Sequence, residues 1–286
     1  MKAVEPKSGD ILLMMSTDEL SKLIAWFGDS AYSHSALMVS EGLLMESIAQ
    51  GITETKLEDL MRPDFNIKYV DVFRSLDRNG DIFSASQQFA MLNSARLFIG
   101  VSFEFGKLVQ IGVLAAVRQK IPANALVRKL LRLAFDHVLA NSDKAMTCSQ
   151  FVYTSLLRAE VAPSASITPR IIYSGPSGLP FPDDIDWQKL IKEIKALLPE
   201  HEKLKNTNWL NEEIKDDEIS LLSDAALQQK AAEVRLALGL SAIDEMQIAT
   251  HTVGDIIDSP NPKLVTPGDL FATPDHIAQG RWFTMQ

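Results

Sequence analysis

The chain contains a single cysteine, Cys148, and its surroundings are typical of a nucleophile. It lies in the segment MTCSQFVYTSLL (146–157), directly before residues with helical spacing, and Thr147 is the expected N-cap. A thiol at a helix N-terminus lies near the positive end of the helix dipole and near free backbone N–H groups, which lower its pKa and can bind an oxyanion. The competing interpretation is a small buried side chain, the commoner role of an isolated cysteine.

His34 is the best candidate for a general base among the five histidines. It opens the strand-like run HSALMV (34–39), where an imidazole is held firmly and can still be reached from a cleft. Taken alone, a histidine of this kind is more often structural or on the surface, so the assignment depends on the cysteine. The others stand in helical or C-terminal contexts without such a pattern: His137, His201, His251 and His276.

A predicted hairpin brings Glu46 close to His34. Two strand-like runs, 34–39 and 43–47, flank residues 40–42, whose sequence is Ser-Glu-Gly. This pattern is typical of a three-residue hairpin loop with its glycine in the left-handed conformation. We therefore expect the two runs to form neighbouring antiparallel strands.

The loop length decides which side chains share a face of the hairpin. A three-residue loop pairs Ala36 with Glu46, so the carboxylate lies on the face of His34 and diagonal to it. From there it could hold the imidazole tautomer and stabilise the imidazolium, as the acid of a catalytic triad does. A two-residue loop would instead turn Ser47 and Ala49 to that face. The alternative for Glu46 is a solvated strand residue.

Patterns along the rest of the chain predict an α+β fold. Two helix starts carry capping-box spacing, Ser16 with Glu19 and Thr55 with Glu58. The segment 176–184 is rich in proline and glycine and is predicted to be a linker. Strands are expected near 9–15, 34–39, 43–47 and 66–73, and helices near 16–27, 55–61, 81–98, 101–120, 123–140, 149–159, 185–198, 220–238 and 242–253.

Composition excludes several classes of protein. With 46% hydrophobic and 23% charged residues the chain is expected to fold around a core, and its net charge of −9 argues against non-specific nucleic-acid binding. One cysteine allows neither an intramolecular disulfide nor a multi-cysteine metal site. The N-terminus has no apolar h-region, and charged residues interrupt the apolar stretch 97–117. We therefore expect no secretory signal and no transmembrane helix, which makes the cytoplasm the default location.

Charge is unevenly distributed along the chain. Residues 105–135 contain six bases and no acid, whereas residues 183–224 contain twelve acids and six bases. The basic and apolar segment could lie against an anionic membrane surface. Alternatively, it could pair with the acidic segment of the same chain. The charge pattern alone leaves both interpretations open.

The order of these motifs resembles the circularly permuted branch of the NlpC-type papain-like superfamily, the YiiX and YebB group, with lecithin retinol acyltransferase as a more distant relative. In ordinary papain-like enzymes the cysteine precedes the histidine, whereas here His34 comes first. The resemblance covers roughly residues 8–75, 85–106, 144–170 and 263–274. The matching features are GDILL, SHSALMV, Glu46, TCSQFVYTSLL and VTPGDLFATP.

This resemblance implies a permuted papain-like α+β fold, with a small antiparallel sheet packed on the cysteine-bearing helix and inserted helices. It makes Cys148 the nucleophile, His34 the base and Glu46 the residue that orients the base. The implied catalytic domain spans 1–175, with an insertion at 107–140. A helical, acidic insertion at 184–258 precedes the return at 259–286. Both insertions depart from the compact family pattern, so the family's usual reactions transfer poorly.

The expected function is that of a cysteine-dependent hydrolase that forms an acyl-enzyme and needs no metal or organic cofactor. The leading substrate is an amide or peptide bond of the kind found in peptidoglycan stems. Because that substrate lies outside the cytoplasm, export by a specialised secretion system, as an antibacterial effector, would reconcile it with the absence of a signal. The alternatives are a lipid acyl hydrolase or acyltransferase that contacts a membrane through 105–135, and a non-catalytic binding module.

Overall fold

The computed structural model describes residues 4–27, 30–103, 145–159, 167–172 and 265–285, with short pieces between 121 and 262. The chain divides into two compact units. The first comprises Met1–Phe103, Ala145–Pro180 and Thr252–Gln286, and the second Glu104–Lys144 and Phe181–His251. Wholly or largely outside the described residues lie the predicted linker 176–184 and the helices predicted near 123–140, 220–238 and 242–253. Of the helix predicted near 185–198 about half is described, and residues 188–190 and 192–193 are helical. The helix predicted near 101–120 is wrong at its start, where Ser102–Phe103 form a strand, and the rest of it lies outside the described residues.

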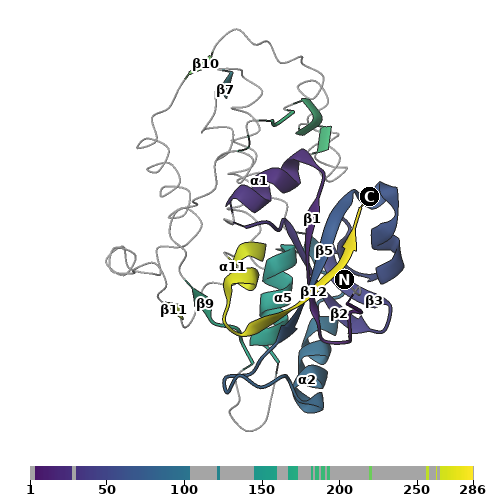
Figure 1. Cartoon of the computed structure of the whole chain (residues 1–286), viewed down its shortest axis with the longest axis vertical. Helices are drawn as coiled ribbons and strands as arrows, with labels where there is room; N and C mark the ends of the chain where they lie inside the picture. The colour runs from purple at the N-terminus through teal and green to yellow at the C-terminus, as the bar shows by residue number, and fades with distance from the viewer. Residues whose placement is uncertain are drawn as a thin grey trace. The chain divides into compact units, whose positions relative to one another are not determined.

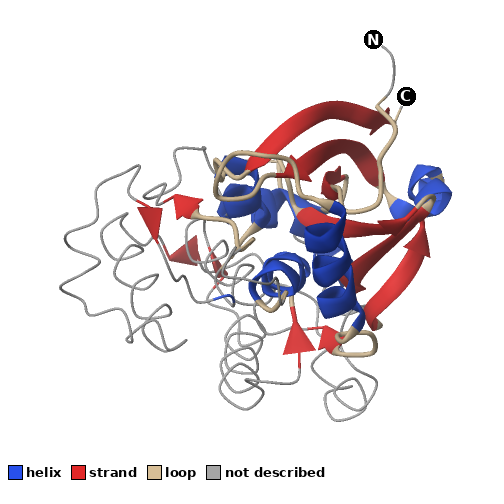
Figure 2. Cartoon of the chain, turned by 90° about the horizontal axis from the view of Figure 1, so that it is seen from below, coloured by secondary structure: helices blue, strands red, loops and turns tan. Residues whose placement is uncertain are grey.

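A six-stranded antiparallel sheet forms the centre of the first unit (Figures 1 and 2), in the order β12-β5-β1-β2-β3-β4. The sheet is therefore larger than the four strands expected, because β4 and β12 were not predicted. Its strands are β1 (Ile11–Ser16), β2 (His34–Ser40), β3 (Leu43–Ile48), β4 (Gly51–Lys56), β5 (Ile67–Ser75) and β12 (His276–Thr284).

Both faces of the sheet are covered, which explains why its central strands are apolar runs rather than alternating patterns. In β1, Ile11 and Leu13 belong to the core shared with the helices, whereas Leu12 and Met14 belong to a second core on the opposite face. All four side chains are fully buried. Successive side chains of β1 therefore pack alternately into the two hydrophobic cores.

The helices on the first face pack around α5 (Cys148–Leu157), which contacts β2, β3, α2 (Ala85–Arg96) and α11 (Pro267–Ala272). Figure 1 shows α5 between α11 and α2. A capping box of Ser84 and Gln87 starts α2, and a second one starts α11. The other described elements are α1 (Glu19–Phe27), the 3-10 helices η1 (Leu57–Met61) and η2 (Pro63–Phe65), and the short strands β6 (Ser102–Phe103), β7 (Ile121–Pro122), β8 (Ala145–Met146), β9 (Ile171–Ile172), β10 (Ile219–Ser220) and β11 (Ile256–Ile257).

Two predicted capping boxes were wrong because strand pairing takes the residues that would cap. Ser16 is the last residue of β1 and pairs with Ile67 of β5. Thr55 lies in β4, opposite Leu44 of β3. The short helix that follows is a 3-10 helix whose N-cap, Lys56, makes no side-chain capping bond.

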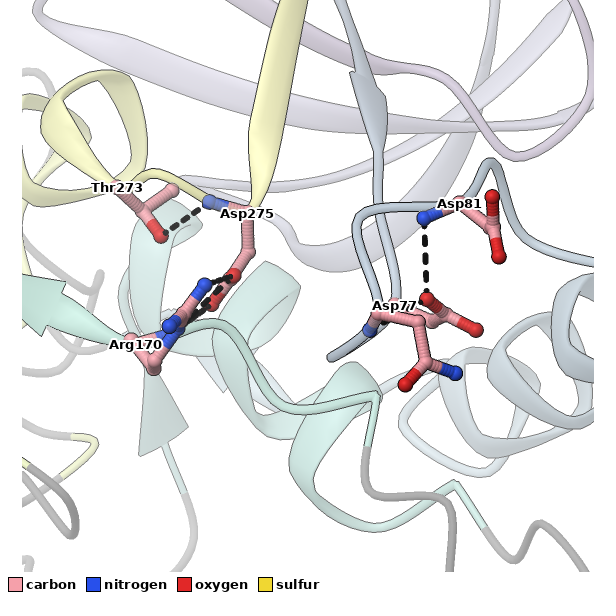
Figure 3. A network of polar contacts seen from close by, with 6 residues as sticks. Asp77, Asp81, Arg170, Thr273 and Asp275 are labelled. Atoms are coloured by element: carbon pink, nitrogen blue, oxygen red, sulfur yellow. Dashed lines mark hydrogen bonds and ion pairs between the residues drawn. The ribbon is translucent and has the colours of Figure 1, made fainter.

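A buried ion pair anchors the start of β12 (Figure 3). The Asp275 carboxylate accepts hydrogen bonds from the Arg170 guanidinium and from the Arg170 backbone N–H at 2.6 Å, and the Asp275 N–H donates to Thr273 Oγ1. Only 4% of the Asp275 side chain is exposed, against 31% for Arg170. Burial alone would raise the pKa of Asp275, but the hydrogen bonds from Arg170 outweigh it and lower the pKa. The ion pair joins the strand to the segment before β9.

Replacing Asp275 with asparagine is expected to lower the free energy of unfolding by about 2 kcal/mol at neutral pH, because several charge-assisted hydrogen bonds are lost. Since the pKa of Asp275 is lowered in the folded state, its contribution is present above the ordinary carboxyl range and is lost as pH falls through the lowered pKa. Denaturant unfolding of both proteins at neutral and acid pH measures this. Asp81→Asn, at an exposed position on a nearby loop (Figure 3), is the control. A difference that persists unchanged in acid would contradict the assignment.

Candidate active site

Cys148 is the first residue of α5, and its position is fixed by a helix cap. Thr147 is the N-cap and its side chain accepts a hydrogen bond from the Gln150 N–H at 3.3 Å, as predicted. Cys148 is 9% exposed, and every residue of α5 from there to Leu156 is buried. The thiol therefore lies at the N-terminal, positive end of the helix dipole, on a helix that is buried in the core.

The hairpin of β2 and β3 brings His34 to Glu46. Ala36 pairs with Glu46, so the predicted register is confirmed, and His34 Nε2 lies 2.7 Å from Glu46 Oε2. The side chain of Glu46 is only 4% exposed, whereas that of His34 is 20% exposed. The solvated interpretation of Glu46 is therefore wrong for this structure.

The loop itself differs from the one predicted. Ser40 pairs with Leu43, so only two residues connect the strands, and a bulge at Val39 restores the register between Met38 and Ser40. Gly42 has φ +70°, the left-handed conformation expected of it. A two-residue loop thus keeps Glu46 on the face of His34, because the bulge supplies the missing residue.

The thiol, the imidazole and the carboxylate influence one another electrostatically. Burial alone would lower the pKa of His34, but the charge of Cys148 and hydrogen bonds to Cys148 and Glu46 raise it. Burial alone would raise the pKa of Cys148, but the charge of His34 and a hydrogen bond to it lower it. The pKa of Glu46 is also lowered, against the effect of burial, by its hydrogen bonds to His34 and Thr55. These opposite shifts are those of a thiolate and imidazolium pair.

Alkylation of Cys148 is expected to follow an inflection well below the ordinary thiol pKa of about 8.5, because His34 stabilises the thiolate. The rate of reaction with iodoacetamide as a function of pH measures this. Since the chain has one cysteine, the reaction reports on Cys148 alone. In His34→Asn the inflection should rise. An inflection at or above the free value in the unchanged protein, or reaction only after unfolding, would exclude a nucleophilic role.

Three hydroxyl groups that sequence reasoning missed hold the parts of this site together. Ser47 Oγ donates to the Met146 carbonyl at 2.7 Å, which ties β3 to the segment before the cysteine. Ser149 Oγ donates to the Val265 carbonyl at 2.6 Å and so joins the start of α5 to the segment before α11. Thr55 hydrogen-bonds Glu46 from β4. Their only sequence signal is a small polar residue within a strand or helix, and it does not identify the partner.

The segment before His34 is anchored by Tyr32, which lies in the same hydrophobic core as the side chains of α5. The Tyr32 hydroxyl donates to Asp71 Oδ2 at 2.8 Å, and Asp71 also accepts two hydrogen bonds from Arg281. The Tyr32 ring packs edge-on against Phe73 with ring centroids 5.9 Å apart. This packing fixes the backbone from which the imidazole projects.

His276, the other histidine among the described residues, has a structural environment. It opens β12, its Nδ1 donates to the Leu270 carbonyl at 2.7 Å, and its Nε2 is buried with no partner in the described part of the chain. Burial lowers the pKa of His276 to about 4, so the ring is neutral at physiological pH. His137, His201 and His251 lie outside the described residues.

Two properties of the described residues concern metals and membranes. No three His, Cys, Asp or Glu side chains in this part of the chain are grouped as metal ligands would be. Among the same residues no helix has both the length and the apolar character needed to cross a bilayer. The basic segment 105–135, apart from Ile121–Pro122, lies outside this part.

Fold and site define an α+β protein in which a six-stranded antiparallel sheet packs against a helix that begins with cysteine. No protein-family model and no curated protein matches the chain. Among solved structures it is similar to the metalloprotein yiiX from Escherichia coli O157:H7, with a TM-score of 0.44 and 15% identity over 96% of this chain and 97% of that one. At this TM-score the permuted papain-like arrangement stays a prediction.

Proposed function

We propose that this chain is a cysteine-dependent hydrolase of amide or peptide bonds, with a permuted papain-like site formed by Cys148, His34 and Glu46. The observation that carries the proposal is the hydrogen bond between His34 and the buried Glu46, on strands that pack against the helix that begins with Cys148. His34 Nε2 bonds to Glu46 at 2.7 Å, which leaves Nδ1 as the ring nitrogen that can exchange a proton with the thiol. A base held between a carboxylate and a nucleophile is the arrangement that triad chemistry requires.

The first half of the reaction forms a thioester. The Cys148 thiolate attacks the carbonyl carbon, and the electron pair of the C=O bond moves to oxygen. The N–H groups of Cys148 and Ser149, which open α5 and have no partner within the helix, would stabilise this oxyanion, whereas the Gln150 N–H is used by the Thr147 cap. As the tetrahedral species collapses, the C–N bond breaks and the His34 imidazolium gives its proton to the leaving amine.

The second half releases the acid. Neutral His34 takes a proton from water, whose oxygen attacks the thioester carbon. The C–S bond then breaks and the sulfur leaves as the thiolate, so that the thiolate and imidazolium pair is restored. Glu46 would keep the imidazole oriented and stabilise its charged form through both halves. An acceptor other than water would make the same intermediate an acyltransferase.

The substrate is the least constrained part of the proposal. Peptidoglycan stem peptides are the leading class, with delivery to competitor cells by a specialised secretion system. The alternative is an acyl lipid, which the six bases of residues 105–135 favour because they could bind an anionic bilayer. A binding module in which Cys148 only packs is the non-enzymatic alternative.

One experiment separates these functions. The unchanged protein and Cys148→Ala are incubated with peptidoglycan fragments and, separately, with phospholipid vesicles, and the products are identified by mass spectrometry. We expect hydrolysed stem peptides with the unchanged protein only. Deacylated lipid would move the assignment to the lipid alternative. Binding without any product from either substrate would support the binding module and overturn the enzyme.

A further inference from the structure

The strand that carries the candidate acid is also bonded to the segment that carries the cysteine. Ser47 follows Glu46 in β3 and is fully buried. Alternation along β3 places Ser47 on the face of Met45, which belongs to the core that contains the α5 side chains. There the Ser47 hydroxyl donates to the Met146 carbonyl at 2.7 Å, two residues before Cys148. Consecutive residues of one strand therefore bond to the base and to the segment of the nucleophile.

Met146 is held from a second side by a short parallel strand. It lies in β8, which pairs with β6 in a register that places Phe103 beside Met146. The chain just before β6 lies against the edge strand β4, where the Ile52 N–H donates to the Val101 carbonyl at 2.8 Å. A Cβ at Gly51 would lie 2.6 Å from the same oxygen, so only glycine allows this approach. Backbone hydrogen bonds therefore connect β8 to the edge of the sheet through β6.

This backbone connection restrains β8 less than a long ladder would. β6 and β8 have two residues each, and such a short pair forms few hydrogen bonds. The Ser47 hydroxyl adds a direct bond from β8 to the sheet, at the point where β2 and β3 part. Their ladder ends at the pair of Ala36 and Glu46, whereas the ladder of β3 with β4 continues to Ile48. Because only Thr147 separates β8 from α5, a shift of β8 would also move the sulfur.

We propose that Ser47 is a positioning residue, whose hydroxyl sets the distance between the cysteine-bearing segment and the strands that carry His34 and Glu46. The inference rests on the proposed function and deepens it. In this role Ser47 acts through the Met146 backbone and takes no part in the reaction itself. Without the hydroxyl, β8 can move away from β3 while it stays paired with β6, and the thiolate and imidazolium lose their alignment.

Removing the hydroxyl tests the proposal. In Ser47→Ala, kcat for the amide substrate is expected to fall by about tenfold to 10²-fold while KM stays nearly unchanged, because a misplacement of reacting groups on the order of 1 Å costs about this much. The inflection in the rate of iodoacetamide alkylation should rise by about half a pH unit, because a displaced imidazolium stabilises the thiolate less well. The charged groups that act on the thiol, His34 and through it Glu46, are unchanged in this variant.

Ser155→Ala is the matched control. Ser155 is also fully buried, and its hydroxyl donates to the Phe151 carbonyl at 2.8 Å. That bond lies within α5, so its loss does not alter how β8 is held against β3. Thermal unfolding of both variants measures the general cost of losing a buried hydroxyl, whereas kcat and the inflection should change in Ser47→Ala only. A folded Ser47→Ala protein that matches Ser155→Ala in kcat and in its inflection would overturn the inference.

A second pair of variants keeps the test open if alanine impairs folding. Ser47→Thr and Ser47→Val have nearly the same shape and differ in the hydroxyl, so any crowding of the core is common to both. The threonine variant should have the higher kcat and the lower inflection of the two. Equal values in this pair would also overturn the inference. Failure of the proposed function looks different, because the thiol of the unchanged protein would then have an ordinary inflection or react only after unfolding.

Discussion

Replacing Cys148 with alanine is expected to lower turnover of the amide substrate on the order of 10⁴-fold or more, while the protein stays folded. The loss is large because the acyl-enzyme cannot form without the sulfur, and the remaining site can contribute only binding and oxyanion stabilisation. Steady-state rates measured with the substrate identified by mass spectrometry give this ratio.

The Cys148→Ala substitution is expected to remove the thiol without disturbing the fold. Cys148 is buried at the start of α5, and alanine at that position removes one sulfur atom without disturbing the Thr147 cap. Thermal unfolding of the variant should stay close to that of the unchanged protein. A folded Cys148→Ala protein that retains most of its activity would rule out a covalent mechanism. The role of the cysteine would then be packing.

Replacing Glu46 with glutamine is expected to lower kcat by about 10²-fold to 10⁴-fold and to narrow the pH range of activity. Glutamine keeps the size of the side chain but removes the charge that raises the pKa of His34 and allows the wrong imidazole tautomer. The alkaline limb of the profile, where the imidazolium loses its proton, should therefore move to lower pH. The acid limb should move to higher pH, because a less basic imidazole stabilises the thiolate less well.

Two variants serve as controls for this prediction. Glu46→Asp keeps the charge at a shorter reach and should recover part of kcat. Glu54→Gln removes an exposed carboxylate from the neighbouring strand β4 and should leave kcat and both limbs unchanged. A Glu46→Gln profile with reduced kcat but unmoved limbs would mean that Glu46 supports the hairpin only.

Local patterns predicted the parts of the site that depend on local structure. The Thr147 cap and the start of α5 are set by a few consecutive residues. The pairing of Ala36 with Glu46 was predicted from a three-residue loop, whereas the loop has two residues, and the register holds because β2 has a bulge at Val39 that the sequence does not reveal. Short-range patterns therefore placed His34 and Glu46 on one face, but the loop length from which this was argued was wrong.

The parts that were not predicted depend on contacts between distant segments. β12 has a glycine and polar residues within it, and it becomes a strand by pairing with β5. The hydroxyl groups of Ser47 and Ser149 find carbonyl partners 99 and 116 residues away. Such partners are chosen by the packing of the whole unit, which periodicity and capping signals do not encode.

The pairing of β12 with β5 has a consequence for how the chain acquires its fold during synthesis. The two strands are also joined by Arg281 and Asp71, which are separated by 210 positions. The first unit consists of three separate stretches of the chain, and the sequence of the second unit lies between them. The ribosome therefore synthesises the whole second unit after β5 and before β12. While the ribosome produces that intervening sequence, β5 is an unpaired sheet edge, which is a site where other chains can add. Closing it is a long-range step and therefore a slow one.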